Sequence, residues 1–191
     1  MKGKTIGFAM CGSFCTIAES LLVLKELANL KANIIPIMSE IVYTTDTRFT
    51  KAENLIKTVE EITNKKIIKT VEQAEPIGPK GLLDLLIICP CTGNTIGKIA
   101  NGITDTSVTM AAKAHLRNNR PVLISLATND ALSGSAQSIG RLLSIKNVYF
   151  TPFGQDDAIK KPTSMICDFK KVIPAGLSAL EGKQMQPILL K

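Results

Sequence analysis

The sequence predicts an α/β fold in which helices cover both faces of a three-layer, doubly wound parallel sheet. Short apolar runs alternate with stretches of helical periodicity along the chain, as is typical of strand–helix–strand units. The strand candidates at 85–89 and 122–126 are almost continuously apolar, as expected for strands that are buried on both faces. Because crossovers between parallel strands are right-handed, such units wind into an open sheet with a ligand-binding edge.

The N-terminal half supplies two strands and two amphipathic helices. The strands are expected at 5–9 and 33–38. Apolar residues at three-to-four spacing predict a helix after each strand: Ile17, Leu21, Leu24, Leu27 and Ala28 in the first, and Leu55, Ile56, Val59 and Ile62 in the second. A threonine-rich connection at 41–49, a short strand at 67–71 and a turn at 76–79 complete this half.

The C-terminal half continues the alternation. Strands are expected at 85–89, 122–126 and 148–150, and helices at 95–101, 106–118 and 138–145. Beyond residue 152 the chain carries Pro152, Pro162, Pro174 and Pro187. We therefore expect a single domain over 1–191, with 152–191 as a C-terminal tail that wraps the surface and forms one more helix at 164–172.

Composition excludes several classes of protein. Hydrophobic residues make up 45% of the 191 residues and charged residues 20%, which is enough for a full core and argues against disorder. The net charge of +7 comes from dispersed lysines with few aromatics and no Trp, so nucleic-acid binding is not expected. No apolar run reaches membrane-spanning length, and the odd number of cysteines, five, does not indicate a disulfide framework. We expect a cytoplasmic protein that binds no membrane.

Four loops should meet at the carboxyl edge of the sheet. They lie at 11–13, 39 onward, 90–95 and 127–130, after the strands expected at 5–9, 33–38, 85–89 and 122–126, and all are rich in small or hydroxyl-bearing residues. Such loops expose backbone N–H groups, and a helix that begins there favours an anion, typically a phosphate. The sequence therefore predicts a nucleotide-like cofactor held across this edge.

Other chemistry-bearing residues have weaker support. Cys11, Cys15, Cys89 and Cys91 could in principle make a tetrahedral metal site, but their spacing lacks paired C-x-x-C motifs, and no metal is predicted. His115 is the only histidine, lies in a helical stretch without a nearby nucleophile, and is expected at the surface. Arg48 could bind a substrate carboxylate bidentately, although a solvated loop arginine remains the alternative.

Three segments resemble the homo-oligomeric flavin-containing cysteine decarboxylases. The motifs are Gly12-Ser13-Phe14-Cys15-Thr16-Ile17-Ala18, Pro90-Cys91-Thr92-Gly93-Asn94-Thr95 and Ala100-Asn101-Gly102-Ile103-Thr104-Asp105. The resemblance implies a flavodoxin-like, Rossmann-like fold with FMN bound between the protomers of a homotrimer or larger assembly.

Within that family the chain is most similar to one branch, the flavoprotein subunits of bacterial dipicolinate synthase. The motifs specific to it are Thr128-Asn129-Asp130-Ala131-Leu132 and Pro152-Phe153-Gly154-Gln155-Asp156-Asp157. This resemblance implies oxidation of a dihydrodipicolinate-type dicarboxylate to dipicolinate during sporulation, in the mother-cell cytoplasm. The partner would be the NAD(P)-binding A subunit of the synthase.

The family also implies roles for individual residues. Gly12, Ser13, Phe14 and Ser39 would contact the flavin phosphate and ribityl chain, Pro90, Cys91, Thr92, Gly93, Asn94 and Thr95 would line the ring, and Thr128 and Asn129 would close the pocket. Asn94 matches the asparagine used in decarboxylation.

Two departures from the decarboxylases bear on the reaction. No histidine occurs at 43–49, and Ala127-Thr128-Asn129 replaces their Pro-x-Met-Asn pattern. Both count against a decarboxylase. A flavin-dependent decarboxylase, a flavin prenyltransferase and a non-catalytic subunit that stabilises its partner remain as alternatives to the oxidoreductase.

Overall fold

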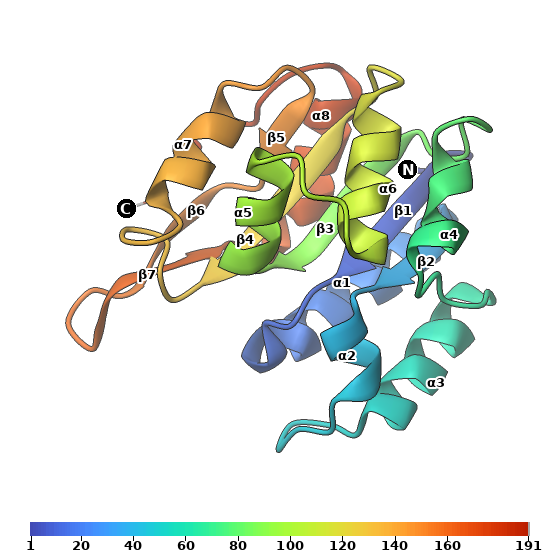
Figure 1. Cartoon of the computed structure of the whole chain (residues 1–191), viewed down its shortest axis with the longest axis horizontal. Helices are drawn as coiled ribbons and strands as arrows, with labels where there is room; N and C mark the ends of the chain where they lie inside the picture. The colour runs from blue at the N-terminus through green and yellow to red at the C-terminus, as the bar shows by residue number, and fades with distance from the viewer. Residues whose placement is uncertain (191) are drawn as a thin grey trace.

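The computed structural model describes residues 1–190 and centres on a seven-stranded mixed sheet. The strands are β1 (Thr5–Met10), β2 (Asn33–Met38), β3 (Leu85–Cys91), β4 (Val122–Thr128), β5 (Val148–Phe150), β6 (Phe153–Asp157) and β7 (Lys161–Cys167). Their order is β2-β1-β3-β4-β7-β6, and β5 pairs with β4 off this path. The α/β sandwich predicted from the sequence is thus confirmed (Figure 1).

The expectation of an all-parallel sheet is wrong at one edge. β1 to β5 pair in parallel, whereas β7 runs antiparallel to both β4 and β6. The antiparallel strand β7 can pair with β4 because β4 is longer than its parallel partner β5. Residues Val122–Ile124 of β4 pair with β5, and Ala127 and Thr128 pair with β7. The free end of β4 therefore carries a hairpin formed by β6 and β7.

The hairpin also shows that the expectation of a surface-wrapping tail after residue 152 is wrong. The sequence predicts a surface helix at 164–172, but β7 occupies Lys161–Cys167 and helix α8 begins only at Val172. Ser164, Met165 and Cys167 are buried, and the strand pairs with both β4 and β6. The segment after residue 152 extends the sheet and contributes α8 to the core, rather than wrapping the outside.

Eight α-helices connect the strands within residues 1–190. They are α1 (Ile17–Asn29), α2 (Glu40–Thr44), α3 (Ala52–Thr63), α4 (Val71–Ala74), α5 (Gly93–Ala100), α6 (Ser107–Leu116), α7 (Ala136–Leu143) and α8 (Val172–Leu180). α2 lies in the stretch expected to be an irregular connection, and the strand expected at 67–71 is reduced to one bridge between Ile68 and Ile37. None of these helices is long and apolar enough to cross a membrane.

The helices divide between the two faces of the sheet (Figure 1). α4, α5, α6 and α7 contribute to one core cluster with side chains such as Ile88 and Ile124. α1, α3 and α8 contribute to a second cluster with Phe8 and Ile87. Neighbouring residues of β3 thus face opposite layers, which explains why this strand is apolar throughout.

His115 is buried in the first cluster's layer, not exposed as the sequence suggested. Its side chain is inaccessible to solvent, and neither ring nitrogen has a hydrogen-bond partner among residues 1–190. Burial, helped by the nearby Arg120 guanidinium, lowers the pKa of His115 to about 4. A neutral imidazole inside the core has no part in acid–base chemistry at the sheet edge.

Candidate functional site

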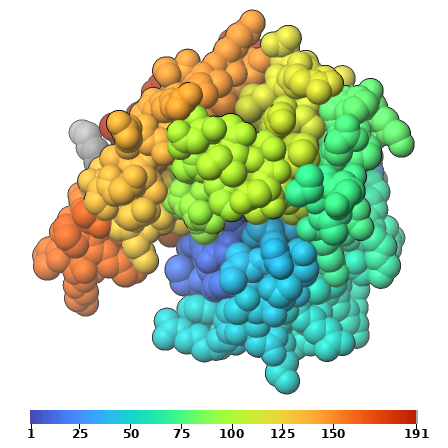
Figure 2. All heavy atoms as spheres, in the orientation of Figure 1, coloured from blue at the N-terminus to red at the C-terminus, as the bar shows by residue number. Residues whose placement is uncertain are grey.

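Two cavities lie at the carboxyl edge of the sheet and share Gly12 and Thr92 in their walls. The α2 cavity, between the β1 loop, α2 and α5, has a volume of about 490 Å³. The hairpin cavity, between the β1 loop and the β6–β7 hairpin, has a volume of about 230 Å³. Figure 2 shows the surface hollowed between the dark blue β1 loop and the orange hairpin. The convergence of loops expected from the strand order thus produces adjoining sites.

The α2 cavity contains an unpartnered polar group. Ser39 is 7% exposed, and its hydroxyl has no hydrogen-bond partner among residues 1–190. It precedes α2 in an extended conformation. Gly12 lines the same cavity, and the Ile41 side chain fills the space beside it, 2.9 Å from where a Cβ would stand. Because buried hydroxyls are normally hydrogen-bonded, the orphaned Ser39 donor suits a bound ligand with acceptor oxygens.

Helix α5 supplies the wall opposite α2. Thr92 caps its first turn by accepting a hydrogen bond from the Thr95 N–H group at 3.4 Å. Asn94, Thr95 and Lys98 of this helix line the cavity. The Lys98 ammonium is held by Asp105 at 2.8 and 2.9 Å, an ion pair that lowers the pKa of the Asp105 carboxyl. The positive end of α5 and this lysine both favour an anion here.

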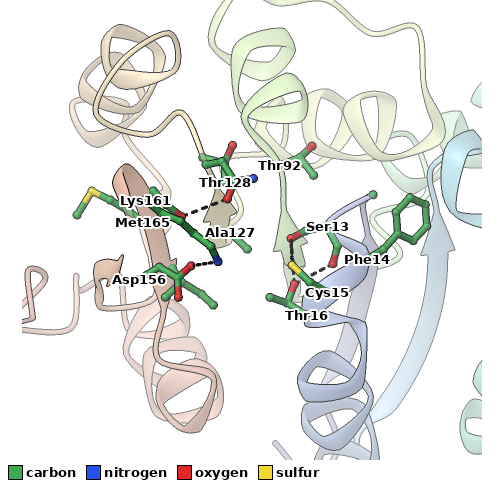
Figure 3. A pocket seen from close by; sticks show the side chains of 14 residues that line it. Ser13, Phe14, Cys15, Thr16, Thr92, Ala127, Thr128, Asp156, Lys161 and Met165 are labelled. Carbon is green, nitrogen blue, oxygen red and sulfur yellow. Dashed lines mark hydrogen bonds and ion pairs between the residues drawn. The ribbon is translucent and has the colours of Figure 1, made fainter. Parts of the chain in front are cut away.

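The hairpin cavity has two facing walls (Figure 3). On one wall the Thr16 hydroxyl donates hydrogen bonds to the Ser13 carbonyl at 2.9 Å and to the Ser13 hydroxyl at 3.1 Å, which fixes the β1 loop. On the other wall Lys161 Nζ donates to Asp156 Oδ2 at 2.7 Å. Thr128 and Asn129, at the end of β4, lie between the two walls. The result is a polar slot with a single cation among its lining residues.

The cysteines form no metal site among the described residues, in which no group of three or more His, Cys, Asp or Glu side chains could hold an ion. Cys15 alone is exposed. Burial raises the pKa of Cys89 to about 12 and holds the pKa of Cys167 well above its usual value. Hydrogen bonds from Cys91 and Thr95 lower the pKa of Cys11, whereas burial raises that of Cys91.

Most of the predicted site residues gather at the two cavities. Those that line one or both are Gly12, Ser13, Phe14, Ser39, Thr92, Asn94, Thr95, Thr128 and Asn129. Pro90, Cys91 and Gly93 are buried beside them and line neither cavity. Their contact with a cofactor stays a prediction for every residue of this set.

Arg48 does not reach either cavity. Its guanidinium lies over the Phe49 ring at 4.8 Å from the centroid, on the loop between α2 and α3, and it lines neither cavity. The substrate-binding role expected for Arg48 stays a prediction, without a cavity contact to support it. Sequence reasoning does not find Lys161, Asp156 and Lys98, and the half-exposed strands of the hairpin gave no periodic signal that residues 156 and 161 belong to the sheet edge.

Comparison with known proteins agrees with this architecture. The profile of the family described as Flavoprotein matches residues 1–176. The dipicolinate synthase B subunit of Bacillus subtilis (strain 168) is 44% identical over 191 residues, which cover 100% of this chain and 96% of that protein.

Solved structures give the same picture. The crystal structure of the dipicolinate synthase B subunit from Bacillus halodurans matches with a TM-score of 0.91 and 42% identity, over 100% of this chain and 97% of that one. An FMN-dependent cysteine decarboxylase matches with a TM-score of 0.68 and 20% identity, over 94% and 98% of the two chains. At that identity the second match shows the shared fold alone.

Proposed function

Because the chain belongs to the flavoprotein family, and within it to the group of dipicolinate synthase B subunits, we propose that it is an FMN-binding oxidoreductase subunit. In this proposal it acts with the nicotinamide-binding A subunit of the synthase and converts a dihydrodipicolinate-type intermediate into dipicolinate. The setting is the mother-cell cytoplasm of a sporulating bacterium, and the chain assembles into a homotrimer or a larger oligomer.

The observation that carries the cofactor proposal is the orphaned hydroxyl of Ser39. Ser39 lines a cavity of about 490 Å³, and its hydroxyl oxygen is buried in the wall without a partner. This volume is in the usual range for ligand and cofactor sites. A phosphate oxygen would satisfy this hydroxyl at no cost in lost protein contacts, and Lys98 with the first turn of α5 would favour the phosphate charge. We assign the FMN phosphate to the α2 cavity on this ground.

Gly12 and Thr92 line both cavities, and in this proposal one ligand spans the two. The ribityl chain would pass Gly12 and Thr92, and the ring would lie toward Thr128 and Asn129. The acid to be oxidised would then occupy the hairpin cavity beside the ring. Bound flavin supplies the redox chemistry that the side chains of this site lack.

The residues of the site would bind and orient rather than transfer protons. Lys98 and Lys161 are each held by a carboxylate, and the only histidine is buried and neutral, since burial lowers the pKa of His115 to about 4. These cations therefore serve as fixed positive charges for anionic ligands. Asn94, which the family resemblance proposes as the catalytic residue, lines the α2 cavity and not the hairpin cavity, so in this arrangement it would contact the cofactor and not the acid.

Reconstitution of the full synthase tests this function. Purified FMN-loaded chain is combined with the nicotinamide-binding partner, a nicotinamide nucleotide and freshly generated dihydrodipicolinate, and dipicolinate is quantified by chromatography. We expect formation of dipicolinate that falls to background when either protein is omitted and that drops sharply with the Asn94→Ala variant. Equal production by the nicotinamide-binding partner alone would contradict an enzymatic role for this chain.

Asn94 also favours a second candidate, a flavin-dependent decarboxylase, because the resembling family uses an asparagine at this position. A peptide with a C-terminal cysteine, incubated with the FMN-loaded chain, separates the two candidates by mass spectrometry. Loss of carbon dioxide from the peptide would favour the decarboxylase, and an unchanged peptide mass the oxidoreductase.

A further inference from the structure

The β6–β7 hairpin places one cation at the edge of a cavity that is otherwise uncharged apart from its own counter-ion. Lys161 and Asp156 are the only charged side chains among the lining residues. Lys161 is the first residue of β7, and its ammonium reaches Asp156 of β6 across the hairpin at 2.7 Å. Figure 3 shows this pair on the wall that faces Ser13 and Cys15.

The position of Lys161 is set by the turn that precedes it. Asp157 pairs with Lys161 in the strand register, and Asp157 Oδ1 accepts hydrogen bonds from the N–H groups of Ile159 and Lys160 at 3.0 and 2.9 Å. Gln155 Nε2 donates to the Pro162 carbonyl at 2.9 Å, which ties the two strands together. The turn thus presents residue 161 to the cavity and leaves its neighbour Lys160 outside the lining.

Lys161 keeps donors available for a ligand. An ammonium has three N–H donors, and the structure assigns one of them to Asp156. The carboxylates of Asp156 and Asp157 and the nearby Cys15 raise the pKa of Lys161, so the side chain stays charged. Its side chain is 54% exposed and that of Asp156 32%, and an exposed pair of this kind holds its partners only weakly. A ligand carboxylate can therefore displace Asp156 from Lys161 at little cost.

A second donor lies on the neighbouring strand end. Asn129 Oδ1 accepts a hydrogen bond from the Ser164 hydroxyl at 3.3 Å, and the Asn129 carbonyl accepts one from the Thr163 hydroxyl at 2.7 Å. Among residues 1–190 no protein acceptor takes the side-chain N–H groups of Asn129. Ala127 and Ile166 add apolar surface to the lining, which suits a flat ring that carries charged groups at its rim, whereas the side chains of Phe14 and Met165 point away from the slot (Figure 3).

We propose that Lys161 is the residue that recognises a carboxylate of the small acid substrate in the hairpin cavity, with Asn129 as the neutral donor beside it and Asp156 as the counter-ion that the substrate carboxylate displaces. This inference rests on the proposed function, since it names the residue by which that same site selects an anionic acid. It gives Lys161 the part that the sequence had suggested for Arg48.

Calorimetric titration with pyridine-2,6-dicarboxylate tests the assignment, with and without saturating FMN. Lys161→Gln removes the charge that lines the cavity, and Lys160→Gln is the matched control with the same change of charge one residue away. We expect affinity for the acid to fall about tenfold in the first variant, as for loss of a charge-assisted hydrogen bond, and less than twofold in the second. The neutral pyridine-2,6-dicarboxamide should not distinguish wild type from Lys161→Gln.

Asp156→Asn separates recognition from hairpin stability. Recognition predicts unchanged or tighter binding of the acid in this variant, because a competing carboxylate is removed while Lys161 remains. Equal weakening by Asp156→Asn and Lys161→Gln would overturn the proposal and show that the pair only braces the hairpin. Wild-type affinity in Lys161→Gln, or no binding of the acid to the wild type, would overturn it as well.

FMN binding is measured in the same proteins, so that the proposed cofactor and the proposed role of Lys161 are tested separately. Retained FMN affinity in Lys161→Gln, with the acid lost, supports the assignment. Loss of FMN in Lys161→Gln with the acid still bound would instead identify Lys161 as a phosphate contact and overturn it. Failure of FMN to bind the wild type refutes the proposed cofactor, and the titration with acid alone still decides the role of Lys161.

Discussion

The carboxylate of Asp130 lies directly against the backbone of Gly93, where an added Cβ atom would stand 2.6 Å from Asp130 Oδ1. Asp130 is fixed there by hydrogen bonds from the Thr128 hydroxyl at 2.5 Å and the Ser135 hydroxyl at 2.9 Å. Gly93 opens α5, so this contact joins the loop after β4 to the helix that lines the α2 cavity. The loop after β3 and the loop after β4 therefore pack directly against each other.

Gly93→Ala should disrupt the packing between these two loops and destabilise the protein. The added methyl group has no room beside Asp130 and Thr128, and overpacking of this kind costs about 1–3 kcal/mol of unfolding free energy. Gly97→Ala in the same helix is the matched control, because its nearest neighbour is the Ser138 hydroxyl at 4.0 Å and an interior Gly→Ala stabilises a helix by roughly 0.5–1 kcal/mol. Urea denaturation measures both, and destabilisation by the two variants alike would contradict the proposed contact.

Ser39→Ala should affect cofactor binding without affecting the fold. The Ser39 hydroxyl makes no hydrogen bond among residues 1–190, so its removal should leave the melting temperature of the ligand-free protein unchanged or slightly higher. Affinity for FMN should fall roughly tenfold or more, since a hydrogen bond to a charged phosphate is lost. Ser178→Ala on α8 serves as the control for the substitution itself, and equal FMN affinity in Ser39→Ala and wild type would rule out the phosphate contact.

His115 should make stability depend on pH below neutrality. Its folded-state pKa is about 4, against a usual value of 6.5, so the unfolded chain binds the extra proton first. The unfolding free energy therefore falls as pH drops from about 6.5 towards about 4, by up to about 3 kcal/mol in total. His115→Leu should flatten this part of the profile in urea denaturation, and an unchanged slope would contradict burial of the imidazole.

Cys15 should be the one thiol that reacts in the folded protein. It is exposed, whereas the other four cysteines are buried, and burial raises the pKa of Cys89 to about 12, which further suppresses reaction. A disulfide reagent such as Ellman's should modify one thiol quickly, lose that phase in Cys15→Ser, and modify all five after unfolding. Since Cys15 lines the hairpin cavity, pyridine-2,6-dicarboxylate should slow the fast phase, and rapid reaction of several thiols would contradict the packing.

The sequence was sufficient for the strands that are apolar on both faces. β3 and β4 could be recognised because their runs are continuous, and the carboxyl-edge rule then placed Gly12, Ser39 and Thr92 together. The β6–β7 hairpin could not be recognised because its strands are half-exposed and carry polar residues, such as Gln155 and Lys161, so that neither period stands out.

Sequence reasoning was also limited at single side chains. His115 falls on the face of α6 shared by Val108, Ala111 and Ala112, all buried, and this spacing could have indicated its burial. The sequence alone could not decide whether Arg48 or Lys161 lies at the cavity. The path of each loop determines which cation reaches it, and that path depends on tertiary packing.

The central claim, that this edge of the sheet holds FMN, is tested most directly by titrating the purified chain with FMN and recording its visible absorption and fluorescence. The account predicts saturable binding with shifted flavin bands and altered fluorescence, and weakening of both changes in Ser39→Ala but not in Ser178→Ala. A protein that leaves the FMN spectrum unchanged at saturating concentration would contradict the flavin site and every role assigned to the α2 cavity.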